Sequence, residues 1–180
     1  WRAGAIAAVL AALIVLVAED GSLLPGAQIA RVSITGIIVD DRTQQDMLEK
    51  IAKDDNVKAV ILSIDSPGGT TTGAEALFAS VRQVAEEKPV VAVLGTVAAS
   101  GGYIAAISAD HIVARGNTIT GSIGVLFQWT QIEELLDSIG VEMKEVKSAP
   151  LKAEPNPFHK TSPEAIRATQ AMLDTSYAWF

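Results

Sequence analysis

The sequence predicts an α/β domain built around a mostly parallel β-sheet. Short runs rich in Val and Ile alternate with longer segments whose apolar residues recur at helical spacing. This alternation is typical of parallel sheets, because each connection between parallel strands needs a crossover. With 180 residues and no cysteine, the chain is long enough to bury one core without disulfides.

The expected elements follow one another closely along the chain. Strands are expected at residues 29–35, 57–64, 90–94, 111–114 and 141–146. Helices are expected at residues 41–53, 72–87, 103–109 and 130–139, and a last helix begins at Pro163, with Ser162 as its N-cap. Pro89 ends the second helix and Gly140 the fourth.

Ser100 lies at the turn between a predicted strand and a predicted helix, in the run AASGGY over residues 98–103. A serine at such a turn is exposed at its tip, and the glycines behind it let a substrate backbone approach closely. Backbone N–H groups here, such as that of Gly101, lie near a helix N-terminus, where negative charge is favoured. This is the geometry of a nucleophile. A helix-capping serine fits the same window equally well.

A second glycine turn follows the strand at residues 57–64, in the run DSPGG over residues 65–69. Pro67 stops the strand, and Gly68 and Gly69 free the backbone to turn its N–H groups toward a ligand. A strand, a glycine turn and a helix together are the usual frame of an oxyanion hole. An ordinary βα turn is the alternative, but two such elements in one domain favour an active site.

The three runs SPGG (66–69), AASGGY (98–103) and TGSIGV (120–125) resemble the signal peptide peptidase A family. These are membrane-anchored, Clp-protease-like serine peptidases of the crotonase superfamily. The resemblance extends from about residue 29 to the end of the chain. It implies a Clp/crotonase-type stacked ββα fold, Ser100 as nucleophile, and an oxyanion hole at Gly68, Gly69 and Gly101.

A further stretch, residues 147–152 followed by 157–161, is similar to the family's lysine motif, whose second lysine is the general base. The resemblance therefore implies that Lys152 is the base and that Ser122 aims its amine; a turn serine is the alternative for Ser122. The family usually has a glycine, an aromatic residue and an aspartate where this chain has Ala149, Leu151 and Ala153.

The residues around each lysine also favour Lys152. A lysine base must be neutral, and burial in an apolar site disfavours the charged form. Lys144 lies between Glu142 and Glu145, which would keep it protonated, and Lys160 lies in a polar stretch. Lys152 has only apolar neighbours, although any single lysine is by default a plain loop residue.

Histidine offers a second route to an activated serine, because the chain contains His111 and His159. Asp110 precedes His111, but adjacent residues on a strand point to opposite faces and do not easily orient one another. A Ser-His-Asp triad therefore stays open but disfavoured. Neither histidine has the spacing of a metal site, and we expect no metal and no cofactor.

Composition excludes one class of partner. The formal net charge is −7 and the sequence has no basic run, so we expect no nucleic-acid partner.

The N-terminal segment is predicted to cross a membrane. Residues 3–18 carry no charge, with Arg2 in front and Glu19 and Asp20 behind. We expect a transmembrane anchor over residues 1–20, a linker over 21–28 and the peptidase domain over 29–180. A cleaved secretory signal is the competing interpretation. Arg2 favours the N-terminal side in the cytoplasm and the catalytic domain outside a bacterial-type cytoplasmic membrane.

We therefore expect a membrane-anchored serine endopeptidase that hydrolyses apolar peptides such as cleaved signal peptides. Ring-forming relatives imply a homo-oligomer, a tetramer or octamer, and relatives continue past the position of Phe180. The alternative is a crotonase-like acyl-thioester enzyme or a non-catalytic interaction domain on the same fold.

Overall fold

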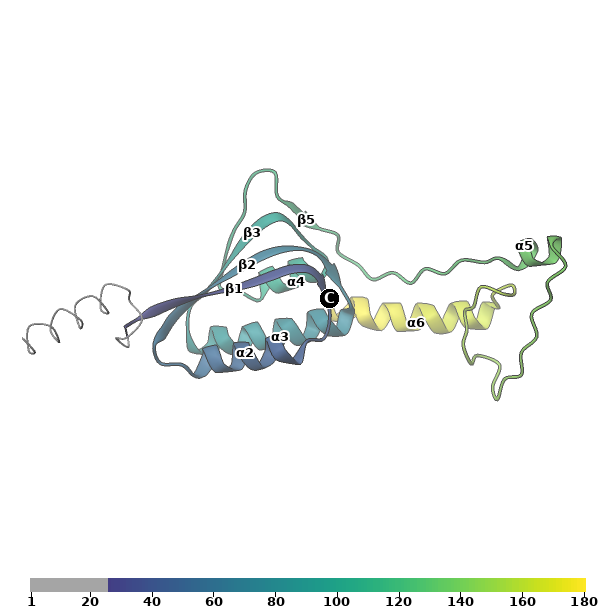
Figure 1. Cartoon of the computed structure of the whole chain (residues 1–180), viewed down its shortest axis with the longest axis horizontal. Helices are drawn as coiled ribbons and strands as arrows, with labels where there is room; N and C mark the ends of the chain where they lie inside the picture. Colours follow the sequence, from purple (N-terminus) through teal and green to yellow (C-terminus); the bar gives the residue numbers. More distant parts are fainter. Residues whose placement is uncertain (1–25) are drawn as a thin grey trace, which may run out of the picture.

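The computed structural model describes residues 26–180 (Figure 1). The predicted anchor at residues 1–20 and most of the predicted linker lie outside the described residues. Within residues 26–180, no helix has both the length and the apolar character needed to cross a membrane.

The centre of the fold is a five-stranded sheet in which every pairing is parallel, as the sequence predicts. The order is β1-β2-β3-β4, and β5 pairs with β3 beyond the end of β4. Residues 91–93 of β3 pair with β4, and residues 97–99 pair with β5. The strands are β1 (Gln28–Ile38), β2 (Val57–Gly69), β3 (Val90–Ala99), β4 (His111–Val113) and β5 (Ile119–Gly121).

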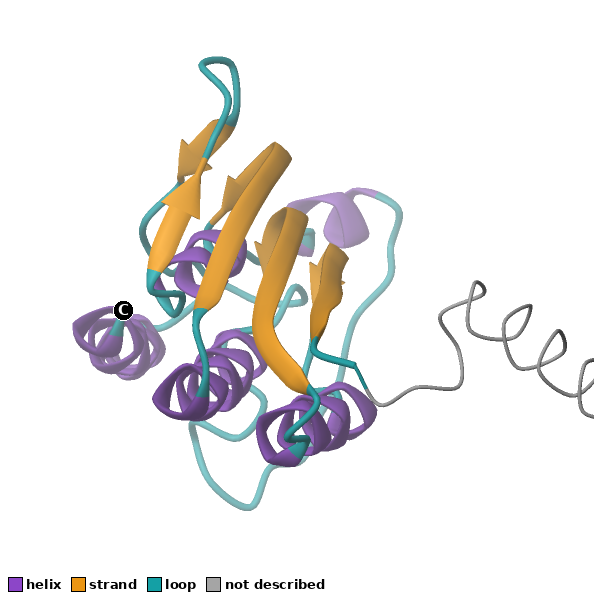
Figure 2. Cartoon of the chain, turned by 90° about the vertical axis from the view of Figure 1, so that its left-hand side faces the viewer, coloured by secondary structure: helices purple, strands orange, loops and turns teal. Residues whose placement is uncertain are grey.

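Helices cover one side of this sheet (Figure 2). Asp41 caps the first of them by accepting the Thr43 N–H at 2.9 Å, and Thr70 caps the second by accepting the Gly73 N–H at 3.1 Å. The helices are α2 (Arg42–Lys53), α3 (Thr71–Glu87), α4 (Gly101–Ile107), α5 (Glu133–Ser138) and α6 (Pro163–Trp179).

The core lies between the sheet and helices α2, α3 and α4. In β2, Val60, Leu62 and Ile64 point inward and are almost fully buried, while their neighbours on the other face are partly exposed. Leu77 and Val81 of α3 pack against this row. Truncating one of these large side chains to Ala would cost about 2–5 kcal/mol, because the close-packed surroundings cannot fill the cavity left behind.

An irregularity between β2 and β3 redirects the end of β3. Ile64 pairs with Leu94 but Ser66 pairs with Ala98, so β3 has three residues between these pairs where β2 has one. The Asp65 carboxylate compensates by accepting the Val97 N–H at 3.0 Å. This bulge sets the direction in which β3 enters the turn that follows.

After β5 the chain leaves the sheet. Residues 122–162, which we call the arm, run outward past α5 and then turn back, and α6 returns toward the sheet (Figure 1). The strand predicted at residues 141–146 is not formed, because no neighbouring strand is there to pair with it and Val146 is fully exposed. The helix predicted at 130–139 is shortened to α5.

Candidate active site

Ser100 connects β3 to α4 in a strained backbone conformation. Its φ of 52° and ψ of −121° lie outside the regions favoured by residues with a Cβ. Such a conformation costs on the order of 1–3 kcal/mol and is found mainly at functional sites. Ser100 precedes the first residue of α4, yet its hydroxyl makes no capping hydrogen bond. The hydroxyl therefore does not cap the helix, and the half-buried Ser100 lies at a strand-to-helix turn of the kind that carries nucleophiles in other folds.

Two contacts hold Ser100 in this conformation. Its N–H donates to the Gly121 carbonyl at 2.7 Å, which joins the turn to the end of β5. On its other side, Gly68 lies so close that an added Cβ would be 2.7 Å from the Ser100 Cβ and 2.8 Å from the Gly101 nitrogen. Gly68 also has a φ of +106°, which glycine adopts without strain. The two predicted glycine turns therefore meet at Ser100.

Ser66 fixes the SPGG turn from beneath. Its side chain is fully buried, and its hydroxyl donates to the Gly36 carbonyl of β1 at 2.7 Å. The same oxygen accepts the Gly68 N–H at 3.1 Å. The Gly68 N–H is thus directed at Ser66, whereas Gly69 follows it at the end of β2, paired with Ile38. This chain of contacts links β1 to Gly68 and through it to Ser100.

A cavity of about 340 Å³ opens beside Ser100. Such a volume is at the small end of the range for ligand pockets, about 300–1,000 Å³. The cavity lies between the two glycine turns, the first residues of the arm and the last turns of α6. Its walls are formed by Gly69, Thr70, Thr71, Ala74, Gly101, Gly124, Val125, Leu126, Phe127, Met172, Leu173, Ser176 and Phe180.

The return of α6 closes one side of this cavity with apolar side chains. The edge of the Trp179 ring also meets the Phe78 ring of α3 at a centroid distance of 6.3 Å and an angle of 86°. Met172 and Phe180 face the cavity from the same helix end. The site therefore places the Ser100 hydroxyl next to a surface that is in part apolar.

The predicted base is not beside Ser100 within one chain. Lys152 is exposed and is not among the residues that line the cavity. The turn of the arm at residues 147–154, which includes it, lies toward the end of α6 that is farthest from the sheet (Figure 1). Ser122 follows Gly121 directly and has a φ of 55°. The structure thus gathers Ser100, the three predicted oxyanion-hole glycines and the loop of Ser122, but leaves Lys152 apart.

Neither histidine is placed to serve Ser100 of its own chain. His111 pairs with Val91 at the start of β3, nine residues before Ser100. At roughly 3.3 Å per residue, this places the two about 30 Å apart along the sheet. The Asp110 carboxylate accepts the Val90 N–H at 2.8 Å and does not orient an imidazole. His159 lies on the arm.

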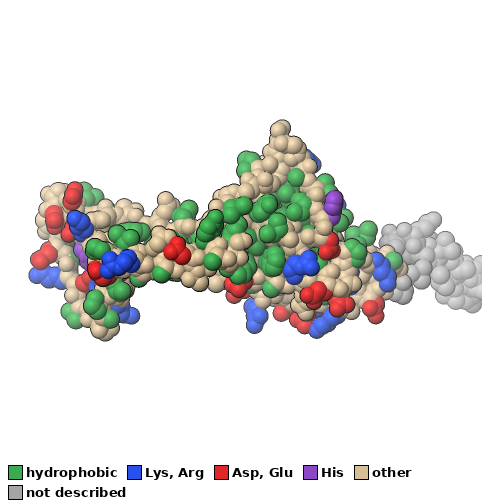
Figure 3. Space-filling model, turned by 180° about the vertical axis from the view of Figure 1, so that it is seen from behind, with side chains coloured by type: hydrophobic (Ala, Val, Ile, Leu, Met, Phe, Trp, Pro, Cys, Tyr) green, Lys and Arg blue, Asp and Glu red, His purple; other side chains and the backbone are tan. Residues whose placement is uncertain are grey.

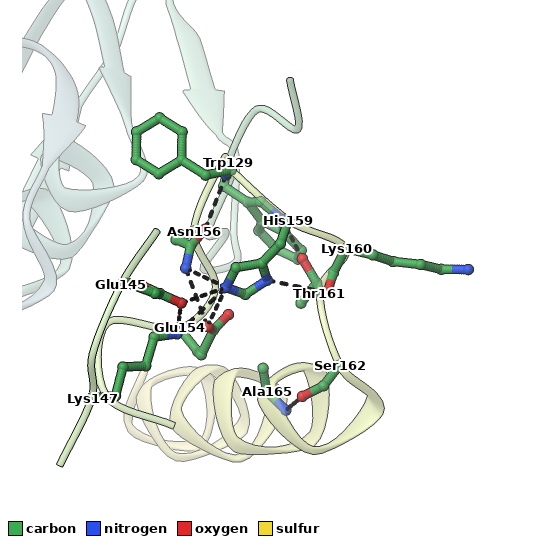
Figure 4. A network of polar contacts seen from close by, with 11 residues as sticks. Trp129, Glu145, Lys147, Glu154, Asn156, His159, Lys160, Thr161, Ser162 and Ala165 are labelled. Atoms are coloured by element: carbon green, nitrogen blue, oxygen red, sulfur yellow. Dashed lines mark hydrogen bonds and ion pairs between the residues drawn. The ribbon is translucent and has the colours of Figure 1, made fainter. Parts of the chain in front are cut away.

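The arm contains a polar cluster that the sequence did not indicate (Figure 4). Lys147 contacts the Glu145 carboxylate at 2.7 Å and also the Glu154 carboxylate. The His159 Nε2 atom lies 3.0 Å from one oxygen of each of the same two carboxylates. Asn156 donates to Glu154 at 3.1 Å. These residues lie on irregular segments without helical or strand periodicity, so no spacing in the sequence predicts that they meet.

Hydrogen bonds and ion pairs shift the pKa values of three residues in this cluster. Hydrogen bonding to Glu145 raises the pKa of Lys147, and the Lys147 ammonium in turn lowers the pKa of Glu145. The Lys160 carbonyl and, after it, Glu145 raise the pKa of His159. Ligand atoms of Glu145, Glu154 and His159 lie within 4.8 Å of one another, as in a metal site. Lys147 already places a positive charge between the two carboxylates, so we assign the cluster as a network of ion pairs.

The chain has relatives in sequence among known proteins. The slr0021 protein of Synechocystis is 37% identical over 155 residues, covering 85% of this chain and 56% of its own length. Protease 4 of Haemophilus influenzae is 37% identical over 138 residues, covering 69% of this chain and 22% of its own. The chain thus spans only part of each relative.

Among solved structures, a mutant of the 1510-N membrane-bound stomatin-specific protease matches with a TM-score of 0.50 and 23% identity. The match covers 60% of this chain and 53% of that one. It supports the Clp/crotonase-type α/β fold that the motifs imply. Residues 82–180, which include Ser100 and Lys152, match Peptidase family S49. The chain belongs to Peptidase family S49.

Proposed function

We propose that this chain is the catalytic part of a serine endopeptidase in which Ser100 is the nucleophile. The observation that carries the proposal is the strained turn at Ser100, which holds an uncapped hydroxyl beside a cavity of about 340 Å³. Crotonase-like thioester chemistry, the competing function for this fold, needs no nucleophilic serine at such a turn.

The reaction begins when the Ser100 Oγ attacks the carbonyl carbon of the peptide bond and its proton passes to the neutral amine of Lys152. The negative charge that develops on the carbonyl oxygen is stabilised by the N–H groups of Gly69 and Gly101. Gly68 contributes no donor here, because its N–H donates to the Ser66 hydroxyl; its lack of a side chain makes room for Ser100 instead.

The carbon–nitrogen bond then breaks, and Lys152 returns the proton to the leaving amine. Water attacks the resulting ester with Lys152 again as base, which releases the acid and regenerates the Ser100 hydroxyl.

Lys152 reaches Ser100 from a second copy of the chain. Two observations support this: Lys152 lies on the arm, away from the cavity of its own chain, and the arm exposes many large apolar side chains. Figure 3 shows such side chains along the arm and, more densely, over the sheet-and-helix part. Apolar surface of this extent on a projecting segment favours association. The assembly is a homo-oligomer, a tetramer or octamer.

The substrate is a peptide with apolar side chains, such as a cleaved signal peptide. Met172, Leu173 and Phe180 supply an apolar wall beside Ser100, and small polar groups occupy the opposite side. We propose that residues 1–20 anchor the catalytic domain on the outer side of a bacterial-type cytoplasmic membrane, because residues 3–18 carry no charge and follow Arg2.

A fluorophosphonate probe tests the nucleophile, since it forms a covalent bond only with an activated serine. Labelling that disappears in Ser100→Ala supports a serine hydrolase; unchanged labelling of that variant contradicts the assignment. Hydrolysis of a thioester without any labelling at Ser100 would favour the crotonase-like alternative.

Mixing two inactive variants tests where the base comes from. Ser100→Ala and Lys152→Ala chains are co-expressed, so that mixed oligomers form. If Lys152 acts on a neighbouring copy, random mixing restores about a quarter of the sites. If both residues act within one chain, no site is restored and the mixture stays inactive.

A further inference from the structure

The segment that carries Lys152 is a closed loop. Residues 147–154, which we call the base loop, begin at Lys147 and end at Glu154, and these two side chains form an ion pair. Inside the loop, the Lys152 N–H donates to the Ala149 carbonyl at 3.1 Å and the Glu154 N–H donates to the Leu151 carbonyl at 3.3 Å. The ion pair fixes the ends, and the two backbone bonds fix the interior.

Glu154 is the buried anchor of this loop. Its side chain is only 5% exposed, and that of Lys147 is 17% exposed. One carboxylate oxygen of Glu154 pairs with Lys147 and His159 and accepts a hydrogen bond from Asn156. The other oxygen is buried and has no hydrogen-bond partner among the described residues. A buried carboxylate depends on its partners, because an uncompensated charge in such a place is strongly destabilising. Loss of any one of these three partners should therefore loosen the base loop (Figure 4).

The two lysines of the base loop have opposite environments. Lys147 is half enclosed between two carboxylates, which favour its charged form. Lys152 is exposed and makes no ion pair in the described part of the chain. Lys147 is thus unsuited to accept a proton, but well suited to hold the loop from which Lys152 projects.

We infer that the Lys147–Glu154 ion pair is a positioning device that presents Lys152 to the nucleophile. The inference rests on the proposed role of Lys152 as base. Lys152 is proposed to act on Ser100 of another copy, so the cavity walls of its own chain do not hold it in place. The loop that carries Lys152 must therefore be held rigid by its own contacts. A misplacement of about 1 Å can cost about 100-fold in rate.

The first test is Glu154→Gln, which keeps the shape of the side chain and removes its charge. We expect kcat to fall about 100-fold with KM unchanged, because the cavity beside Ser100 is untouched. The matched control is Glu142→Gln. Glu142 pairs with Lys144 at 3.2 Å on the same arm, but both side chains are more than three-quarters exposed (77% and 79%), so kcat should stay at the wild-type value.

A second variant, Lys147→Met, shows whether the pair acts as a unit. The double variant with Glu154→Gln and Lys147→Met should have about the same kcat as the less active of the two single variants, because each change breaks the same ion pair. Losses that multiply would mean that the two residues act independently, which would overturn the inference.

A further readout separates positioning from folding. In the Ser100→Ala background, adding Glu154→Gln should leave the affinity for a labelled apolar peptide and the sedimentation coefficient unchanged. Parallel loss of peptide binding or of assembly would show a purely structural role and overturn the inference.

The inference and the proposed function fail in different ways. If Glu154→Gln keeps kcat within about twofold of wild type while Lys152→Ala is inactive, the base assignment stands and the positioning role is wrong. If Lys152→Ala is itself active, the base assignment is wrong and the inference falls with it.

Discussion

Two regions of this chain hold their functional residues in different ways: the sheet-and-helix part holds Ser100, and the arm holds Lys152. Ser100 lies between two strands and a helix, against a glycine that leaves it no room to move. Lys152 lies on a projecting loop that is held by a local cluster of charges. Ser100 is thus positioned by the core of the fold, whereas Lys152 is held by a few polar contacts and, we propose, by a second copy.

The two regions also differ in how many hydrophobic side chains they bury. All but one of the buried hydrophobic side chains in the described part belong to residues 26–121, and the exception is Ala165 of α6. The arm instead exposes side chains such as Leu126, Leu135 and Val146. Outside the base loop, a region without a core of its own is expected to gain its fixed shape on assembly. The following predictions test that contrast.

The largest effect is expected at Ser100 itself. Ser100→Ala should lower kcat/KM for a peptide substrate by about 10⁴-fold or more, since the reaction loses its nucleophile. Lys152→Arg should be nearly as inactive, because guanidinium stays protonated at any working pH. Hydrolysis of a fluorogenic peptide measures both, and circular dichroism should show an unchanged fold. An active Lys152→Arg variant would mean that a charge, not a base, is needed at that position.

The next effect is expected at Gly68, where the core fixes the nucleophile. Gly68→Ala should lower kcat by at least about 100-fold, because the new Cβ would fall 2.7 Å from the Ser100 Cβ at a φ of +106°. The melting temperature, measured by thermal unfolding, and the rate of peptide hydrolysis should both fall.

Gly116→Ala is the matched control, since nothing lies within 4 Å of its added Cβ and its φ is not positive. We expect that variant to keep the activity and melting temperature of the wild type. Full activity in Gly68→Ala would contradict the close contact between the two turns.

A smaller effect is expected at Ser66. Ser66→Ala leaves the buried Gly68 N–H and the Gly36 carbonyl without their partner, which should cost about 1–3 kcal/mol of stability. It should also lower kcat more than it raises KM, because the SPGG turn loses its attachment to β1. Chemical denaturation and steady-state kinetics measure the two effects.

Ser80→Ala is a suitable comparison, since the Ser80 hydroxyl bonds only to the Ala76 carbonyl one turn back in α3. Its stability should change little. Equal kinetic losses in Ser66→Ala and Ser80→Ala would argue against a special role for Ser66.

The smallest effect is expected in the arm, as a function of pH. The pKa of His159 is raised above its ordinary value of 6.5, so protonated His159 stabilises the folded arm. That contribution is fully present below the unfolded pKa and is lost as pH rises through the folded pKa. Hydrogen exchange of residues 145–160 should therefore quicken as pH increases above about 6.5, beyond the intrinsic rise, while that of β2 should not.

His159→Gln should remove this pH dependence and leave the rest of the exchange pattern unchanged. A pH dependence that survives in His159→Gln would assign it to another group.

The sequence was most informative where local pattern and core burial agree. The strand at residues 57–64, the helix cap at Ser162 and the turn at Ser100 all follow from short-range rules. The meeting of Gly68 with Ser100 depends on the parallel pairing of β2 and β3, which brings the ends of both strands to the same edge of the sheet. These features depend on residues close in sequence or on the parallel topology.

The arm was less predictable. Residues 141–146 have the apolar alternation of a strand, but a strand forms only where a partner strand is available. β5 was missed because three residues that include a glycine carry no pattern. The cluster around Glu154 joins side chains up to 14 positions apart on irregular backbone, and only tertiary structure brings them together. We propose that the position of Lys152 relative to Ser100 depends on contacts with a second copy of the chain.

The separation of Ser100 from Lys152 has a consequence for a chain that has not yet associated with another copy. Under the proposal that Lys152 acts on a second copy, an unassembled chain has Ser100 without its base and is inactive until it meets another copy. Specific activity should therefore fall on dilution, and the loss should be reversed on concentration. Association between copies would then be the step that switches hydrolysis on.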